Sequence, residues 1–585
     1  MTYRAPLRDL VFALVEVAEV ERLAGTPAFP DFDRETVEAV LQGVADLAEN
    51  VLAPLNRSGD QEGAVYENGR VTTPAGFPEA YRAFAEGGWN SLAADPAYGG
   101  QGLPRALEQA VFETIHAANM AFGLCPMLTQ SAIEALHAHG TAPQKALYLP
   151  RLISGEWTGT MNLTEPQAGT DLAAIRSRAE PNGDGSYSLH GQKIFITWGD
   201  HDCAPNIIHF VLARLPDAPE GTKGISLFLA PKRLTAENGT LGGLNGVRPS
   251  GIEHKLGINA SPTCVMVFEG ARAELVGEPN QGLAAMFTMM NAARLGVGVE
   301  GVGIAERAYQ QALGYARERR QGRSAWTGQP GAPIFDHPDV RRMLSLMKAK
   351  IEAARAMCLV TAVAADLARV AEDQAERERA QRRQDLLVPI AKAWSTDVGV
   401  EVASLGVQVH GGMGFIEDTG AAQHYRDARI APIYEGTNGV QAMDLAGRKL
   451  AMNGGLAVTE LISDMRVTAN ALNGELSDLQ NPLMDGVTAV EEGARWLVER
   501  RGTPDALAGA APFLQMTGDV IGGWLLAKGA LAARNVAEDD YLRSKGWLAR
   551  FYADHVLSPA PARLSAVTAG AEELYALTPE LLGAA

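Results

Sequence analysis

Apolar residues recur with a helical period over much of the first quarter of the chain. Those at 37, 40, 41, 44, 47 and 51 predict a helix from Asp33 to about Leu55. A shorter apolar-periodic segment, Leu7 to Leu23, precedes it and predicts a helical arm. Residues 56–76 are polar, with Gly and Asn among them, and predict a loop. Helices are then expected from about Glu79 to Ser154.

The pattern changes to strand-like runs between Trp157 and about Gly277. Short runs rich in β-branched and aromatic residues alternate there with turns of Gly, Asn, Asp and Pro. Such spacing is typical of a small all-β domain. The runs are residues 186–190, 193–197, 207–213, 225–230 and 263–268.

Helical spacing returns after Leu283 and continues to the end of the chain. Long helices are expected over residues 283–320, 336–370 and 386–409. The charges at 376–383 indicate a solvated helix face or a loop rather than a binding patch, because acidic residues alternate with the arginines. Beyond Gly454 lies an additional helical block rich in Ala and Leu.

The order of these stretches predicts a mainly α protein with a central β domain and an additional C-terminal helical domain. A chain of 585 residues is long for one domain, so several units are expected. They are an N-terminal helical arm (1–34), an N-terminal α domain (35–158), a central β domain (159–277), an α domain (278–453) and a C-terminal helical domain (454–585).

Composition narrows the classes of partner and the expected compartment. The net charge of −18 counts against nucleic acid as a general partner, because phosphate binding needs a basic surface. The four cysteines are far apart and form no CxxC, so we expect neither a disulfide framework nor a metal site. Neither a secretory signal nor a membrane span is predicted, and a cytoplasmic protein is expected.

The segment Ile433 to Thr437 contains the strongest candidate for acid–base chemistry. A single carboxylate, Glu435, lies there between apolar residues and Gly436. Apolar surroundings raise the pKa of a carboxyl toward neutral pH, and glycine lets a ligand approach the backbone. This pattern predicts a general base, and the alternative is an acidic residue at the start of the helix expected from Asn438.

Other stretches contain residue types suited to binding a planar or anionic ligand. Met161 to Asp171 supplies hydroxyls and turn backbone groups, and Ile194 to Gly199 is an aromatic strand end. The arginines within 317–323 suit a phosphate. An ordinary turn, a strand with core aromatics and a solvated helix end are the alternatives. No GxGxxG motif lies at a strand–helix junction, so a Rossmann cofactor site is not supported.

Three of these segments together resemble the acyl-CoA dehydrogenase family: MNLTEPQAGTDL (161–172), QVHGGMGF (408–415) and IYEGTN (433–438). The resemblance covers about residues 35–455. It implies FAD as cofactor, an acyl-CoA thioester as substrate and an electron-transfer flavoprotein as electron acceptor. It also implies that Glu435 removes the α-proton while the flavin takes the β-hydride. Some members place the base one residue before the arginine matched by Arg294, where this chain has Ala293, so Glu435 is the only family-compatible base.

The matched motifs imply which residues contact the ligands. The expected cofactor contacts are Leu163, Thr164, Thr170, Phe195, Thr197, Arg319, Gln321, Gln408, Gly411, Gly412 and Thr437. The expected substrate contacts are Thr170, Asn291, Arg294, Glu435 and Gly436. In the family, the contacts near 319 and 408 reach the FAD of a neighbouring subunit, so a homo-oligomer, expected to be a dimer, is implied. Phe195 stands where the family often has tryptophan, and Gly322 replaces a phenylalanine.

The first residues and the long C-terminal block resemble a large bacterial subgroup of this family. That subgroup includes an enzyme of dimethylsulfoniopropionate breakdown and also contains straight-chain acyl-CoA dehydrogenases. The expected reaction is oxidation of 3-(methylthio)propionyl-CoA to methylthioacryloyl-CoA, and the alternative substrate is a short or medium straight-chain acyl-CoA. A DNA-associated or a non-catalytic flavoprotein of the same fold are further alternatives. The net charge of −18 counts against the first, and the presence of Glu435 counts against the second.

Overall fold

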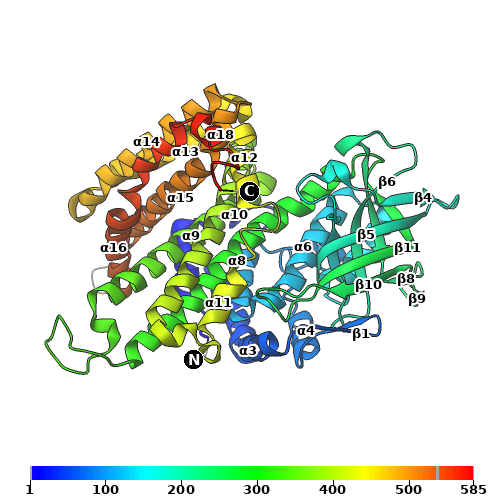
Figure 1. Ribbon diagram of the computed structural model, residues 1–585, viewed down its shortest axis with the longest axis horizontal. Coiled ribbons are helices and arrows are strands. Elements are labelled where there is room, and N and C mark those ends of the chain that lie inside the picture. The colour runs from blue at the N-terminus through cyan, green and yellow to red at the C-terminus, as the bar shows by residue number, and fades with distance from the viewer. Residues whose placement is uncertain (1–2, 535–538, 584–585) are drawn as a thin grey trace.

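A computed structural model describes residues 3–534 and 539–583 of the chain. Residues 1–2, 535–538 and 584–585, which belong to the expected N-terminal arm and C-terminal domain, lie outside the described residues. Figure 1 shows a β domain at one end of the molecule and a group of C-terminal helices at the other. The predicted fold class, mainly α with a central β domain and a helical C-terminal part, is confirmed.

The N-terminal helices precede the β domain. They are α1 (Leu7–Phe12), α2 (Arg34–Leu47), α3 (Ala53–Glu62), α4 (Phe77–Glu86), α5 (Arg105–Ala118), α6 (Met120–His139) and α7 (Ala142–Ile153). Among them, α5 and α6 pack against the long central helix α8 (Gly282–Glu318). Asp33 caps α2 by accepting a hydrogen bond from the Thr36 N–H at 2.8 Å. The predicted helical arm is not a free extension, because Leu10 and Leu14 are fully buried in the main core.

The prediction of a polar loop over residues 56–76 is wrong. Helix α3 continues to Glu62, and β1 (Val65–Glu67) and β2 (Arg70–Thr72) then form a hairpin. Asn68 and Gly69 have φ angles of 51° and 78°, the left-handed conformation that Asn-Gly favours in a tight hairpin turn. Helix α3 buries the polar residues Asn56 and Asp60, and each hairpin strand has three residues, so too few apolar positions remain for a period to be read.

The β domain is a sheet that closes on itself. Its strands are β3 (Thr158–Asn162), β4 (Arg178–Pro181), β5 (Tyr187–Thr197), β6 (Ile207–Arg214), β7 (Ile225–Pro231), β10 (Val247–Ile252) and β11 (Thr263–Val276). Strand β7 pairs with both β6 and β11, while β11 also pairs with β5, and this closes the ring. The runs expected at 186–190 and 193–197 form a single strand, β5, with a register shift in its pairing.

Three long helices form the centre of the molecule, between the β domain and the C-terminal helices (Figure 1). They are α8 (Gly282–Glu318), α9 (Pro338–Val370) and α10 (Gln374–His410). Helix α8 is long and apolar enough to cross a membrane by length and composition, yet 61% of its most apolar window is buried inside the protein. It is therefore best understood as a core helix.

The helices that follow α10 carry the candidate site and the C-terminal block. They are α11 (Ala421–Ala428), α12 (Asn438–Asp444), α13 (Leu456–Ala471), α14 (Gln480–Glu499), α15 (Pro504–Ala533), α16 (Asp540–Tyr552), α17 (Leu564–Thr568) and α18 (Glu572–Ala576). The charges at 376–383 lie on the first turns of α10, and a helix face is confirmed. Arg382 pairs with Glu460 of α13 and Arg383 with Asp464, so this face holds the C-terminal block against α10.

Candidate active site

The candidate base lies in a tight turn between α11 and α12. Glu435 and Gly436 have φ angles of 56° and 81°, so both adopt the left-handed conformation. This is uncommon for a residue other than glycine, and it marks a backbone held in place by its surroundings. Thr437 caps α12 by accepting a hydrogen bond from the Val440 N–H at 3.2 Å. Glu435 therefore precedes the helix cap, and the alternative of an acidic residue in the first helical turn is not what the structure shows.

The surroundings of Glu435 adjust its acidity. Its side chain is half-buried. Burial raises the pKa of Glu435 from its ordinary value to about 7, against the opposing effect of the nearby Arg294 and Lys392 cations. A carboxyl with a pKa near neutral is suited to accept a proton at physiological pH.

Two charged residues that the sequence analysis did not select lie beneath this turn. Glu300 of α8 is fully buried and accepts a hydrogen bond from the Tyr434 hydroxyl, and burial raises the pKa of Glu300 to about 8. Lys392 of α10 is also fully buried, and its Nζ donates to Asn438 Oδ1 at 2.9 Å. The sequence signal that could have identified them is a single charged residue within a long apolar stretch, in GVEGV (298–302) and in PIAKAW (389–394).

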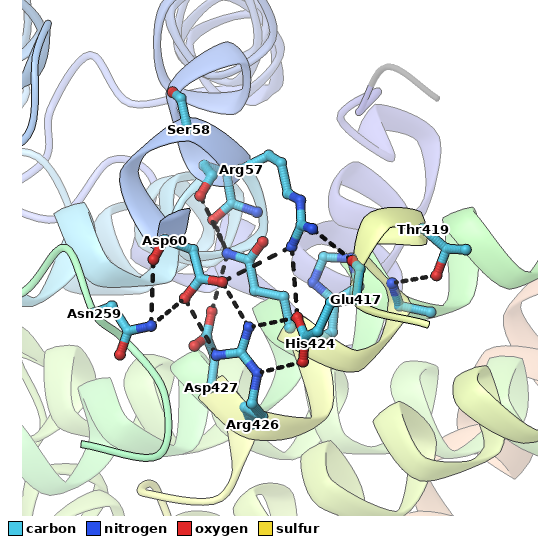
Figure 2. A network of polar contacts seen from close by, with 12 residues as sticks. Arg57, Ser58, Asp60, Asn259, Glu417, Thr419, His424, Arg426 and Asp427 are labelled. Atoms are coloured by element: carbon cyan, nitrogen blue, oxygen red, sulfur yellow. Dashed lines mark hydrogen bonds and ion pairs between the residues drawn. The ribbon is translucent and has the colours of Figure 1, made fainter. Parts of the chain in front are cut away.

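A polar network fixes the start of the segment that leads to Glu435. Figure 2 shows Arg426 of α11 between Asp60 of α3 and Glu417, and the Arg426 Nη2 to Asp60 Oδ2 distance is 2.6 Å. Asp427 is fully buried, since it is 2% exposed, and accepts a hydrogen bond from the Ile258 N–H at 2.5 Å. Helix α11 is thus tied both to α3 and to the segment after β10, which limits how far the following turn can move.

The expected substrate contacts on α8 lie beside the turn. Arg294 is buried, and its Nη1 donates to Asn291 Oδ1 at 3.2 Å. A Cβ placed on Gly436 would lie 3.8 Å from Arg294 Nη2, so the structure brings these residues together. Arg294 Nε is buried and has no hydrogen-bond partner among the described residues. This donor is available to a polar group of a ligand.

The expected flavin contacts in the β domain share one edge of that domain. Leu163 and Thr164 follow β3, and the Ile194 N–H of β5 donates to Thr164 O at 2.9 Å. Lys193 is fully buried, and its Nζ donates to Leu163 O at 2.9 Å and pairs with Glu165. These bonds hold the segment rigidly beside the end of β5.

Phe195 has the clearest signs of a ligand contact in this region. It adopts a φ of 60° and is 59% exposed, whereas the neighbouring Trp198 is fully buried. An aromatic ring held out of the core by a left-handed backbone offers a flat surface for a planar ring system. Thr197 is half-buried at the end of β5, and Thr170 is exposed in the turn that follows Glu165. These residues fit an isoalloxazine ring.

The remaining expected cofactor contacts lie at the C-terminal ends of α8 and α10. Arg319 follows Arg294 by 25 residues, or about 37 Å along a straight helix. Tyr315 stacks on His410 with ring centroids 4.4 Å apart, which places the 319 and 411 ends side by side. Arg319, Gln321, Gly411 and Gly412 are exposed. The structure does not bring this group, which includes Gln408, together with Glu435 within one chain.

Family models match almost the whole chain. The acyl-CoA dehydrogenase N-terminal, middle and C-terminal domain models match residues 34–156, 160–271 and 280–450, and a model described as acetyl-CoA dehydrogenase C-terminal like matches residues 461–578.

Relatives of known function match over similar lengths. The chain is 45% identical to a 3-methylmercaptopropionyl-CoA dehydrogenase of Ruegeria pomeroyi, covering 97% of this chain and 98% of that protein. It is 36% identical to the broad-specificity linear acyl-CoA dehydrogenase FadE5 of Mycobacterium tuberculosis, covering 91% and 90%. Solved structures agree in fold: Caenorhabditis elegans ACDH-11 in complex with C11-CoA has a TM-score of 0.79 at 22% identity, covering 95% of this chain and 92% of that one. An acyl-CoA dehydrogenase of Bacillus anthracis complexed with FAD has a TM-score of 0.74 at 22% identity, covering 95% and 91%.

Proposed function

The chain belongs to the acyl-CoA dehydrogenase family, a family of FAD-dependent oxidoreductases, and on that premise we propose that it oxidises 3-(methylthio)propionyl-CoA to methylthioacryloyl-CoA. The 45% identity over nearly the full length of a 3-methylmercaptopropionyl-CoA dehydrogenase supports this substrate. The 36% identity to a broad-specificity linear acyl-CoA dehydrogenase favours straight-chain acyl-CoA as the second candidate.

Glu435 is the proposed base, and the observation that carries this role is its place in the turn. The carboxyl lies half-buried beside Arg294, and burial brings its pKa to about 7. It can therefore take the α-proton of a bound thioester near neutral pH. The left-handed backbone at Glu435 and Gly436 fixes where that carboxyl points.

Proton removal places negative charge on the thioester oxygen, and this turn offers a donor for it. Among residues 3–534 and 539–583, the backbone N–H of Glu435 donates to no protein acceptor. A free N–H fixed beside the base is suited to stabilise an enolate-like oxygen. Arg294, with its unpartnered buried Nε, is suited to bind a polar group of the substrate.

FAD, when bound, supplies the hydride acceptor. We assign its ring to the edge formed by Leu163, Thr164, Phe195 and Thr197, with Thr170 and Thr437 completing the site. Arg319 and Gln321, with Gln408, Gly411 and Gly412, are assigned to the FAD of a second subunit. The separation of about 37 Å along α8 supports this division, and it implies a homo-oligomer, most simply a dimer. An electron-transfer flavoprotein is the proposed electron acceptor, and the cytoplasm is the proposed compartment.

The test is an anaerobic titration of the flavin-loaded protein. Bleaching of the flavin absorbance by 3-(methylthio)propionyl-CoA, at lower concentration than by butyryl-CoA or octanoyl-CoA, is the expected result. Preferential bleaching by one of the straight-chain thioesters would replace the proposed substrate with the second candidate. A flavin that none of the three bleaches would overturn the proposal as a whole.

A further inference from the structure

Lys392 is a buried cation that forms no ion pair with any residue that the structure describes. Its side chain is fully buried in α10, and its Nζ forms one hydrogen bond, to Asn438 Oδ1 at 2.9 Å. Among the described residues it forms no ion pair, unlike the other buried lysines, which pair with carboxylates at 2.8 to 2.9 Å: Lys193, Lys449 and Lys545. A buried charge is costly unless something offsets it. The position of Lys392 therefore calls for an explanation.

Charged groups face Lys392 from the turn, from its own helix and from α8. Glu435 faces it from the turn, Asp397 from its own helix α10, and Glu300 and Arg294 from α8. Glu300 is largely protonated at neutral pH, because burial raises its pKa to about 8. Helix α15 contributes the neutral Gln515, which donates a hydrogen bond to Asp397. Of the facing carboxyls, Glu435 is the one at the reaction centre.

We propose that Lys392 is a positioning residue for the reaction: its buried ammonium stabilises the ionised form of the Glu435 carboxyl and holds Asn438 beneath the catalytic turn. This inference rests on the proposed role of Glu435 as base. An opposite charge favours the ionised carboxylate, so the base stays deprotonated at a lower pH than burial alone would allow.

The Asn438 amide is oriented toward Lys392 by its other bonds. Asn438 Nδ2 donates to Ala393 O at 3.0 Å and to Asp397 Oδ1 at 2.8 Å. Both are acceptors only, so the NH₂ group faces them and the amide oxygen faces the Lys392 ammonium. Asn438 lies at the first position of α12, three residues after Glu435. The bond from Lys392 thus fixes the helix that follows the turn.

The C-terminal block extends this arrangement. Gln515 of α15 binds the same Asp397 carboxylate that accepts from Asn438. Helix α15 is pressed closely against α10, since a Cβ on Gly518 would lie 2.3 Å from the Trp394 ring. Trp394 Nε1 also donates to Asp519 Oδ1 at 3.0 Å. The C-terminal domain therefore braces the residues that hold Lys392 and Asn438.

The test is the pH dependence of kcat/KM for the flavin-loaded holoenzyme and its Lys392 variants. Lys392→Gln removes the charge and keeps a donor for Asn438, whereas Lys392→Met removes both. Both are expected to move the acidic limb of the profile upward by about one pH unit, which is about a tenfold loss at pH 6. Lys392→Arg keeps the charge and is expected to keep the limb in place.

A matched control removes a buried lysine far from the turn. Lys545→Met removes one of the two lysines that pair with Asp9 and Glu352, and Lys348 is the other, so its Tm is expected to fall while the acidic limb stays unchanged. An unchanged limb in Lys392→Gln, or a limb displaced equally in Lys392→Arg, would overturn the inference. Lys392→Gln carries the test if Lys392→Met does not fold. Glu435→Gln distinguishes failure of the proposed base from failure of this inference. Normal turnover in Glu435→Gln would show that the proposed base is wrong. An inactive Glu435→Gln, together with an unchanged acidic limb in Lys392→Gln, would overturn this inference alone.

Discussion

Replacing Gly436 by alanine tests whether the geometry of the turn governs catalysis. Gly436 has a φ of 81°, where an added Cβ costs about 1–2 kcal/mol in the left-handed conformation. That Cβ would lie 2.7 Å from Gln441 Nε2, which donates to Gly436 O at 3.1 Å. Gln441 is fully buried, so it cannot move away freely, and loss of this hydrogen bond costs about 1 kcal/mol more.

The sum is a loss of roughly 2–3 kcal/mol in the free energy of unfolding, taken from the backbone and the hydrogen bond together. A displacement of the neighbouring carboxyl by about 1 Å is sufficient to reduce turnover about 100-fold. We therefore expect Gly436→Ala to lower Tm by a few degrees and kcat by tenfold or more, with flavin retained.

The assay is thermal unfolding and steady-state turnover of the variant beside two controls. Gly454→Ala has a φ of 67° and no atom within 4 Å of its Cβ, so it reports the backbone cost alone. Gly447→Ala lies in a helical turn with open space around it and is expected to be neutral. Gly436→Ala with normal turnover, or with no more loss of activity than Gly454→Ala, would refute the reasoning that the turn positions the base.

Four further outcomes are expected. Glu435→Gln should lose about 10²–10⁴-fold in turnover while the protein stays yellow, as measured by product formation and flavin absorbance; near-normal turnover would contradict it. In the native enzyme, kcat/KM should fall about tenfold per pH unit below pH 7, because protonation of Glu435, whose pKa is about 7, removes the base. Phe195→Gly relieves a left-handed φ of 60°, so Tm should not fall. The variant should nevertheless lose flavin faster on dilution than the native enzyme. Equal flavin retention in the two proteins would remove Phe195 from the site. Burial raises the pKa of Asp427 to about 7, so the folded protein favours the neutral carboxyl and loses stability as pH rises from about 4 to 7. At pH 8, Asp427→Asn should therefore raise the free energy of unfolding by at least about 1 kcal/mol, measured by denaturant unfolding. A lower free energy of unfolding at that pH would contradict this.

The failure over residues 56–76 shows where periodic patterns stop being informative. Helix α3 and the β1–β2 hairpin are short, and α3 buries the polar Asn56 and Asp60 rather than an apolar face, so few apolar positions repeat. The turn chemistry of Asn68 and Gly69 was present in the sequence and was sufficient to indicate the hairpin. The long helices and the main strands, by contrast, were predicted because each buries a continuous apolar face.

The sequence by itself determined the order of helical and strand stretches and the local chemistry of the IYEGTN segment. Both are local properties: a helical period and a carboxyl beside glycine can be read within a few residues. Only the tertiary structure decided which buried charges meet. Glu300, Lys392 and Gln515 are each unremarkable on their own helices, and they converge on the turn because α8, α10 and α15 pack together there. It also decided that Arg319 and Gly411 lie side by side and far from Arg294, because the 25 residues from Arg294 to Arg319 span about 37 Å along α8.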